Sequence, residues 1–140
     1  MNVKIDDIMI DKPIVTTPHT SVAHAKQLMR DHHISSLPVV GPDGDAVGIL
    51  SASDLLNDLP DEKPVSQMMT RQVYSVPRYD DAHVAARIMR NHHIHHLVVT
   101  HERRVVGVLS AYDLLAFIED HRFVGKNAFT PSTGRTPRRV

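Results

Sequence analysis

The chain contains one sequence unit twice. Residues 48–56 read Gly-Ile-Leu-Ser-Ala-Ser-Asp-Leu-Leu and return at 107–115 as Gly-Val-Leu-Ser-Ala-Tyr-Asp-Leu-Leu. Upstream, residues 28–37 return at 88–97 with their Met-Arg and His-His-Ile elements in register. A period of about sixty residues indicates a duplicated supersecondary unit. Because each copy would be marginal on its own in a chain of 140 residues, we expect the two to pack as one domain.

Each copy is predicted to run strand, helix, strand, strand, helix, an α+β pattern. The first strands are expected at Pro13–Thr17 and Val73–Val76, each closed by a proline. The helices that follow carry apolar residues at helical spacing, namely Val22, Ala25, Leu28 and Met29 in one copy and Ala82, Ala85, Ile88 and Met89 in the other. We expect Thr20 or Ser21 to cap the first helix, and Asp80 or Asp81 the second.

The second half of each copy is predicted as a hairpin followed by another helix. Residues 34–40 and 46–50 have strand character in the first copy, as do 94–100 and 105–109 in the second. The first hairpin turns through Gly-Pro-Asp-Gly at 41–44, and the second turn is one residue shorter. The last helices are expected to begin at Ser51 and Ser110.

The chain divides at a polar, proline-bounded linker at 60–64. We place the first repeat at 1–62 and the second at 63–122, and interpret the basic segment 123–140 as a flexible tail. Ile5–Met9 and Val65–Met69 are predicted to be short helical lead-ins, each ending in methionine before a strand.

Composition narrows the class of protein. The formal charge is zero, so nothing global favours nucleic acid or an anionic membrane as a partner. The chain has no cysteine, which excludes disulfides and thiolate chemistry. No apolar stretch is long enough for a membrane span, and the N-terminus lacks the basic-then-apolar pattern of a signal peptide, so a soluble cytoplasmic protein is expected.

The repeated motif Gly-x-Leu-Ser-x-x-Asp stands where a strand ends and a helix begins. Free backbone N–H groups at such a helix start favour a phosphate, and a carboxylate one turn later can accept both hydroxyls of a ribose. The same Ser-x-x-Asp spacing is also close to a capping box, which satisfies the helix end and binds nothing. Both interpretations are compatible with the motif.

The ordered set of motifs resembles a tandem pair of cystathionine-β-synthase-type (CBS) domains, a Bateman module without a fused effector domain. The resemblance covers about residues 1–120. It rests on residues 15–18, 33–40, 42–44, 47–51 and Asp54 in the first copy, and on 74–77, 93–99 and 106–113 in the second. It implies two β-α-β-β-α repeats packed sheet to sheet with pseudo-twofold symmetry, and two clefts between them.

The resemblance also implies which residues bind a ligand. In one cleft, Asp54 would hold a ribose, Ser51 would lie near a phosphate, and the segment Lys12, Pro13 and Ile14 would contact the adenine base of the ligand. In the other, the corresponding residues are Asp113, Ser110 and the segment Thr70, Arg71, Gln72 and Val73. Ser35, Ser36, His95 and His96 would meet phosphates near the pseudo-twofold axis.

The chain contains eleven histidines, and the run 92–96 has three possible interpretations. The first is ordinary surface histidines, or imidazolium groups that complement the C-terminal dipole of a helix. The second is phosphate contact by His95 and His96. The third is a metal site, which would need His92 and His96 on one face of a continuous helix, although strand residues already begin at Ile94.

We therefore expect a regulatory binding module rather than an enzyme, with no obligatory cofactor. The resemblance implies an adenosine-containing ligand of the AMP, ATP, NAD or S-adenosylmethionine class, and an unidentified effector protein as a possible partner. A homodimer is also expected from the apolar residues of the last helices, which are Leu55, Leu56, Leu114, Leu115, Phe117 and Ile118. The alternatives are a structural dimerisation or docking module with empty clefts, and a histidine-based metal-binding protein.

Overall fold

The computed structural model describes residues 3–56 and 59–121, and the predicted tail at 123–140 lies outside these residues. The first repeat contains α1 (Ile5–Ile8), β1 (Ile10–Asp11), α2 (Val22–Asp31), β2 (Ser36–Val40), β3 (Ala46–Ser51) and the 3-10 helix η1 (Ala52–Leu56). The second contains the 3-10 helix η2 (Val65–Gln67), β4 (Ser75–Pro77), α3 (Ala82–His92), β5 (His96–His101), β6 (Arg104–Ser110) and α4 (Ala111–Asp120). Within these ranges, no helix has the length and apolar character that a bilayer crossing requires.

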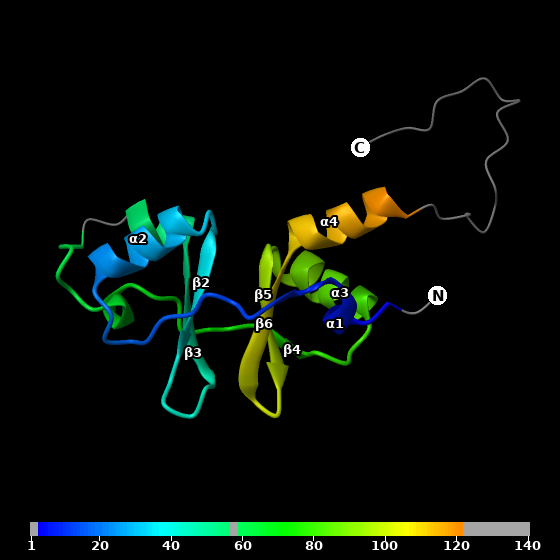
Figure 1. Cartoon of the computed structure of the whole chain (residues 1–140), viewed down its shortest axis with the longest axis horizontal. Coiled ribbons are helices and arrows are strands. Elements are labelled where there is room, and N and C mark those ends of the chain that lie inside the picture. The colour runs from blue at the N-terminus through cyan, green and yellow to red at the C-terminus, as the bar shows by residue number, and fades with distance from the viewer. Residues whose placement is uncertain (1–2, 57–58, 122–140) are drawn as a thin grey trace, which may run out of the picture.

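Two sheets lie side by side at the centre, with α2 outside one and α1, α3 and α4 beside the other (Figure 1). One sheet has the order β1-β6-β5-β4, and the other consists of β2 and β3. Single bridges extend the smaller sheet, because Thr16 pairs in parallel with Val39 and Thr70 pairs antiparallel with Ile49. The two sheets therefore have corresponding topologies, and the predicted α+β fold of two repeats is confirmed.

The first strand of each repeat is shorter than the sequence predicted. In place of a strand over Pro13–Thr17, the chain makes the single Thr16 bridge, with hydrogen bonds from Thr16 N–H to the Pro38 carbonyl and from Val40 N–H to the Thr16 carbonyl. In the second repeat, β4 begins two residues later than expected. Prolines on either side of Thr16 remove the N–H donors that a longer ladder would need.

The final helix differs between the repeats. α4 is a ten-residue α-helix, whereas η1 is a five-residue 3-10 helix. In α4 the Ser110 hydroxyl accepts the Asp113 N–H at 3.1 Å, but in η1 the Ser51 hydroxyl donates to the Asp54 carboxylate instead. The equivalent cap of the first α-turn is therefore missing from η1, and Pro60 follows soon after.

The long helices begin as the sequence predicts in one repeat and differently in the other. Ser21 caps α2 by accepting the His24 N–H at 3.1 Å. Asp81 occupies the N-cap position of α3, yet its side chain makes no cap hydrogen bond. It is directed instead toward Lys4 of the N-terminal lead-in, so the predicted capping role of this carboxylate is wrong.

Each lead-in is buried in the core of the opposite repeat. Ile5 of α1 packs with the second-repeat residues Leu97 and Leu109. Val65 and Met68 of the second lead-in pack in the first-repeat core, which includes Leu37. Ile5 and Val65 are fully buried, and burial of a side chain of this size contributes about 1.5–3 kcal/mol. The two repeats thus exchange their N-terminal segments.

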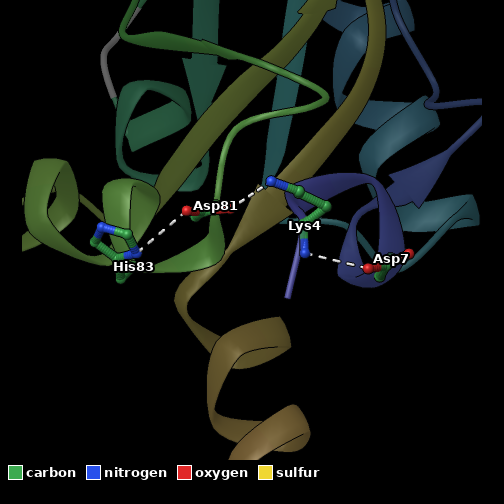
Figure 2. A network of polar contacts seen from close by, with 4 residues as sticks. All are labelled: Lys4, Asp7, Asp81 and His83. Carbon is green, nitrogen blue, oxygen red and sulfur yellow. Dashed lines mark hydrogen bonds and ion pairs between the residues drawn. The ribbon is translucent and has the colours of Figure 1, made fainter. Parts of the chain in front are cut away.

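Ion pairs supplement the burial of the first lead-in. Lys4 Nζ donates to Asp81 Oδ1 at 2.7 Å, and His83 Nδ1 lies 4.0 Å from the other oxygen of this carboxylate (Figure 2). This hydrogen bond raises the pKa of Lys4 and lowers the pKa of Asp81. Arg78 Nε donates to Asp6 Oδ1 at 2.8 Å. Solvent screens ion pairs at the surface and leaves them only a small net contribution, so apolar burial is the larger stabilising effect.

The methionine at the end of each lead-in lies against the motif glycine of the opposite repeat. A Cβ added at Gly48 would overlap the side chain of Met69, and one added at Gly107 would overlap that of Met9. Neither glycine has a positive φ, so the requirement is for close approach rather than for a special backbone conformation. The glycine of each motif is therefore explained by packing.

We predict that Gly48→Ala lowers the free energy of unfolding by about 1–3 kcal/mol, because the added methyl group overpacks the contact with Met69. In a Met69→Ala background the same substitution should cost clearly less. Urea denaturation of the two single variants and the double variant measures this coupling.

The second repeat provides a matched comparison. A Cβ at Gly107 would also lie 2.9 Å from the Ile10 carbonyl oxygen, which cannot withdraw as a side chain can. Met9→Ala should therefore relieve Gly107→Ala less completely than Met69→Ala relieves Gly48→Ala. Additive free energies at the Gly48–Met69 pair would contradict the packing explanation.

Candidate functional site

The two Gly-x-Leu-Ser-x-x-Asp motifs stand at the junctions of β3 with η1 and of β6 with α4. In the second repeat, Ser110 N–H donates to Asp113 Oδ2 at 2.8 Å, which completes a capping box. In the first, Ser51 N–H donates to Asp54 Oδ2 at 2.8 Å, and the Ser51 hydroxyl donates to the same oxygen at 3.1 Å. Both carboxylates are therefore held in place by the backbone that precedes them.

A large cleft of about 850 Å³ opens beside the first motif. Its lining includes residues from both repeats, namely Ser35, Ser36, Ile49, Ser51, Ala52, Ser53, Asp54, Thr70, Gln72, Tyr74, His93, Ile94, His95, His96, Ser110, Ala111, Tyr112 and Leu115. This volume lies within the range of about 300–1,000 Å³ that is typical of small-molecule sites.

A small cleft of about 250 Å³ opens beside the second motif. It is lined by Ile10, Pro13, Ile14, His33, Ile34, Ser35, Ser36, His96, Val108, Ser110, Tyr112 and Asp113. The structure thus brings together most of the residues that the sequence singled out, in two cavities related by the repeat.

The pairing of these residues is the reverse of the predicted one. Asp54 shares its cleft with Thr70 and Gln72, whereas Asp113 shares its cleft with Pro13 and Ile14. The prediction that Asp54 pairs with Lys12–Ile14, and Asp113 with Thr70–Val73, is wrong. The reason is the exchange of lead-ins, since each lead-in enters the sheet of the opposite repeat before it reaches the cleft.

Three predicted residues line neither cleft. Thr70, Gln72 and Tyr74 line the large cleft, so alternation along an extended segment directs Arg71 and Val73 elsewhere. Lys12 is exposed and adopts the left-handed conformation with a φ of 53°, although Ile10, Pro13 and Ile14 on either side of it line the small cleft.

Sequence reasoning missed Tyr74 and Tyr112, which both line the large cleft. Tyr74 is stacked on His92 with ring centroids 4.3 Å apart. Tyr112 stands at the motif position that Ser53 occupies in the first repeat. A comparison of the two copies at positions where they differ in size would have identified Tyr112.

A shared wall separates the two clefts. It consists of the residues that line both cavities, which are Ser35, Ser36, His96, Ser110 and Tyr112. Ser35 Oγ and His96 Nε2 are hydrogen-bonded at 3.1 Å, so this wall joins the first repeat to the second. Of the four residues predicted near the pseudo-twofold axis, Ser35, Ser36 and His96 lie in this wall, whereas His95 lines only the large cleft.

His96 is half-buried in the shared wall. Burial lowers the pKa of its imidazole, the positive charge of a protonated His95 acts in the same direction, and the Asp113 carboxylate opposes both. His95 and His96 both line the large cleft. His93 lines it as well, although it was not among the predicted ligand-binding residues.

The histidine run does not form the helical pair that a metal site would need. α3 ends at His92, and His93 adopts the left-handed conformation with a φ of 55°. Among the residues that the structure describes, no three histidine or carboxylate side chains gather closely enough to hold a metal ion. The imidazoles in the clefts are thus candidates for polar contact with a ligand.

We predict that part of the acid sensitivity of folding arises at His96. Since its pKa is lower in the folded than in the unfolded chain, the unfolded chain binds more protons below about pH 6.5, and stability falls as the pH drops through that value. His96→Asn keeps a hydrogen-bonding partner for Ser35 but does not titrate, so its stability should fall less between pH 7.5 and 5.5. Urea denaturation at both pH values measures the difference.

The control for this prediction is His24→Asn, which removes an exposed histidine of α2. This variant should retain more of the pH dependence of the wild-type protein than His96→Asn does. Equal pH dependence in the wild-type protein and in His96→Asn would contradict the role of His96.

Comparison with known proteins identifies the repeated unit. The model of the CBS domain family matches the chain twice, over residues 5–61 and 65–120. The chain is 31% identical over 112 residues, or 79% of its length, to homoserine O-acetyltransferase of Methanocorpusculum labreanum. It spans 23% of the length of that protein, and 40% of a second curated relative from Methanocaldococcus jannaschii.

Two solved structures are similar to the whole pair. One is the CBS domain pair of protein MJ0100 in complex with 5′-methylthioadenosine and S-adenosyl-L-methionine, with 26% identity, a TM-score of 0.79, and coverage of 86% of this chain and 98% of that one. The other is CBSX2 in complex with AMP, with 25% identity, a TM-score of 0.75, and coverage of 84% and 96%. The double family match and these similarities show that the chain belongs to the CBS domain family, as a tandem pair of CBS domains.

Proposed function

We propose that this CBS pair is a regulatory module that binds an adenosine-containing ligand and has no chemistry of its own. The observation that carries the proposal is the large cleft, where Asp54 and Ser51 lie together with Thr70 and Gln72 in a cavity of suitable size. The two structural relatives named above were solved with adenosine compounds, which supports this ligand class. AMP, ATP, NAD and S-adenosylmethionine are the candidates within it.

The residues of the large cleft suit the parts of such a ligand. In the described residues both contacts of Asp54 use Oδ2, so Oδ1 can accept hydrogen bonds from a ribose diol. The Gln72 amide offers a donor and an acceptor to the edge of a base. His95, His96 and Ser35 offer donors to a phosphate. The capping contacts and the binding role are thus compatible, since they use different oxygens of one carboxylate.

A structural docking module is the second candidate, and a specific observation favours it. The hydrogen bonds of Asp54 and Asp113 to the motif serines and the methionine packing at Gly48 and Gly107 need no ligand, and the motif leucines are buried in the cores. A ligand-binding measurement therefore has to distinguish the two functions.

We predict that AMP stabilises the wild-type protein against heat, and that Asp54→Asn weakens the binding. The asparagine carbonyl can still accept the Ser51 N–H, but its amide group replaces the oxygen that would accept from the ribose. The loss of one acceptor for a buried diol should cost about 1–3 kcal/mol of binding free energy. Thermal shift followed by isothermal titration calorimetry measures both effects.

Arg71→Gln is the matched control, because Arg71 neighbours Gln72 in sequence but does not line the cleft. It should bind AMP with an affinity close to that of the wild-type protein. If AMP, ATP, NAD and S-adenosylmethionine all fail to bind at millimolar concentration, the docking function replaces the sensor.

We further propose a homodimer that relays ligand binding through its geometry or to an effector protein. Leu56 of η1 is 82% exposed, and Tyr112, Leu115 and Ile118 of α4 are 83%, 60% and 55% exposed, so both elements present apolar side chains to solvent. Leu55 and Leu114, which the sequence assigned to the same face, instead pack against the two cores. A twofold contact would reuse one such face on both chains.

Light scattering at micromolar concentration should therefore give twice the mass of one chain. Leu115→Asp and Ile118→Asp together should reduce this mass to that of a monomer, because charges would enter the contact. Glu119→Asp, on the same helix, keeps the charge pattern and should leave the dimer intact. A monomeric wild-type protein would contradict the dimer and this route for the signal.

A further inference from the structure

The two clefts differ although the repeats that form them correspond. The large cleft presents Thr70, Gln72 and Tyr74 from the segment that follows the second lead-in. At the same place in the small cleft stand Ile10, Pro13 and Ile14, which carry no polar side-chain atoms. The volumes, about 850 and 250 Å³, differ in the same direction. The segment that follows the lead-in therefore gives the large cleft a polar side and more room, and gives the small cleft an apolar side and less room.

The groups that could meet an anion are also divided unequally. Repeat 2 has His95 where repeat 1 has Ser35, and His95 lines only the large cleft. With His93 and His96, this gives the large cleft three imidazoles beside one carboxylate, Asp54. The small cleft has His33 and the shared His96 beside Asp113. An imidazole can donate to a phosphate oxygen, whereas a nearby carboxylate repels it.

The shared wall limits how many phosphates the pair can hold. Ser35 and His96 line both clefts and are bonded to each other, so a phosphate against this wall in one cleft lies close to any phosphate against it in the other. Two phosphates there would repel each other and would compete for the same donors. An uncharged ligand in the second cleft avoids both conflicts.

We propose that the two clefts bind different classes of adenosine compound. The large cleft takes a phosphorylated nucleotide, with its phosphate against His95 and the shared wall, and the small cleft takes an uncharged nucleoside. The apolar residues of the small cleft suit the faces of a base, and Asp113 suits a ribose. This inference rests on the proposed binding of adenosine compounds and adds which cleft takes which class.

Calorimetry with AMP and adenosine tests the division. The wild-type protein should bind one AMP per chain, and protein saturated with AMP should then bind one adenosine per chain. His95→Ser, which copies the first repeat, should weaken AMP binding about tenfold or more and adenosine binding to the AMP-saturated protein much less. Asp113→Asn should weaken adenosine binding to the AMP-saturated protein and change AMP binding much less. His24→Ser, on the exposed face of α2, is the control for the loss of a histidine.

Asp113 also caps α4, so its substitution could act through the helix. Ile10→Trp gives a second test that leaves this cap unchanged. Ile10 is 57% exposed, so a larger side chain there can fill the small cleft without entering the core. It should abolish the second binding event while AMP still binds. Circular dichroism melts of each variant confirm that it is folded.

The outcomes separate this inference from the proposed function. If neither AMP nor adenosine binds the wild-type protein, the division is overturned, and the proposed function fails with it when ATP, NAD and S-adenosylmethionine do not bind either. Two AMP molecules per chain of equal affinity, or equal effects of His95→Ser on both ligands, would overturn the division while leaving a nucleotide-binding module. No adenosine binding to the AMP-saturated protein would overturn it as well.

Discussion

The contact of each lead-in with the opposite repeat determines the rest of this structure. Met69 lies on Gly48 and Met9 lies on Gly107, so the chain can enter each sheet only where the motif strand has no side chain. The segments that follow these methionines then form one side of a cleft, and the motif aspartate of the opposite repeat forms the other. Because each cleft needs both repeats, neither repeat could form it alone.

Local pattern was sufficient to predict most of the fold. Apolar spacing identified the buried face of α2, where Ala25 and Met29 are buried, and the Gly-Pro-Asp-Gly turn located the first hairpin. The exchange of lead-ins could not be read in this way, because Ile5 would have satisfied the core of either repeat equally well. Only packing between residues distant in sequence decides that choice, and the pairing of site residues was reversed as a result. The small glycine opposite a flexible methionine is the signal that could have shown it.

The candidate site was predictable in residue type but not in detail. The motif located Ser51, Asp54, Ser110 and Asp113 correctly beside the clefts. The motif alone allowed either capping or ligand binding by the aspartate. In the structure each cap uses only one of the two carboxylate oxygens, so the two roles are compatible. The contribution of Tyr112 to both clefts depends on where α4 begins, which a pattern gives only to within a residue or two.

Duplication with an exchanged segment also explains how the two clefts could diverge while the scaffold stayed symmetric. A substitution in the core of one repeat must preserve packing, whereas one at a cleft position changes the ligand environment at little cost in stability. His95 and Tyr112 stand at such positions, opposite Ser35 and Ser53 in the other copy. His96, by contrast, lies in the shared wall, so its replacement alters both clefts together. In the function proposed above, His95 is the position that sets ligand preference, and the hydrogen bond between His96 and the hydroxyl of Ser35 is the contact that would couple the two clefts.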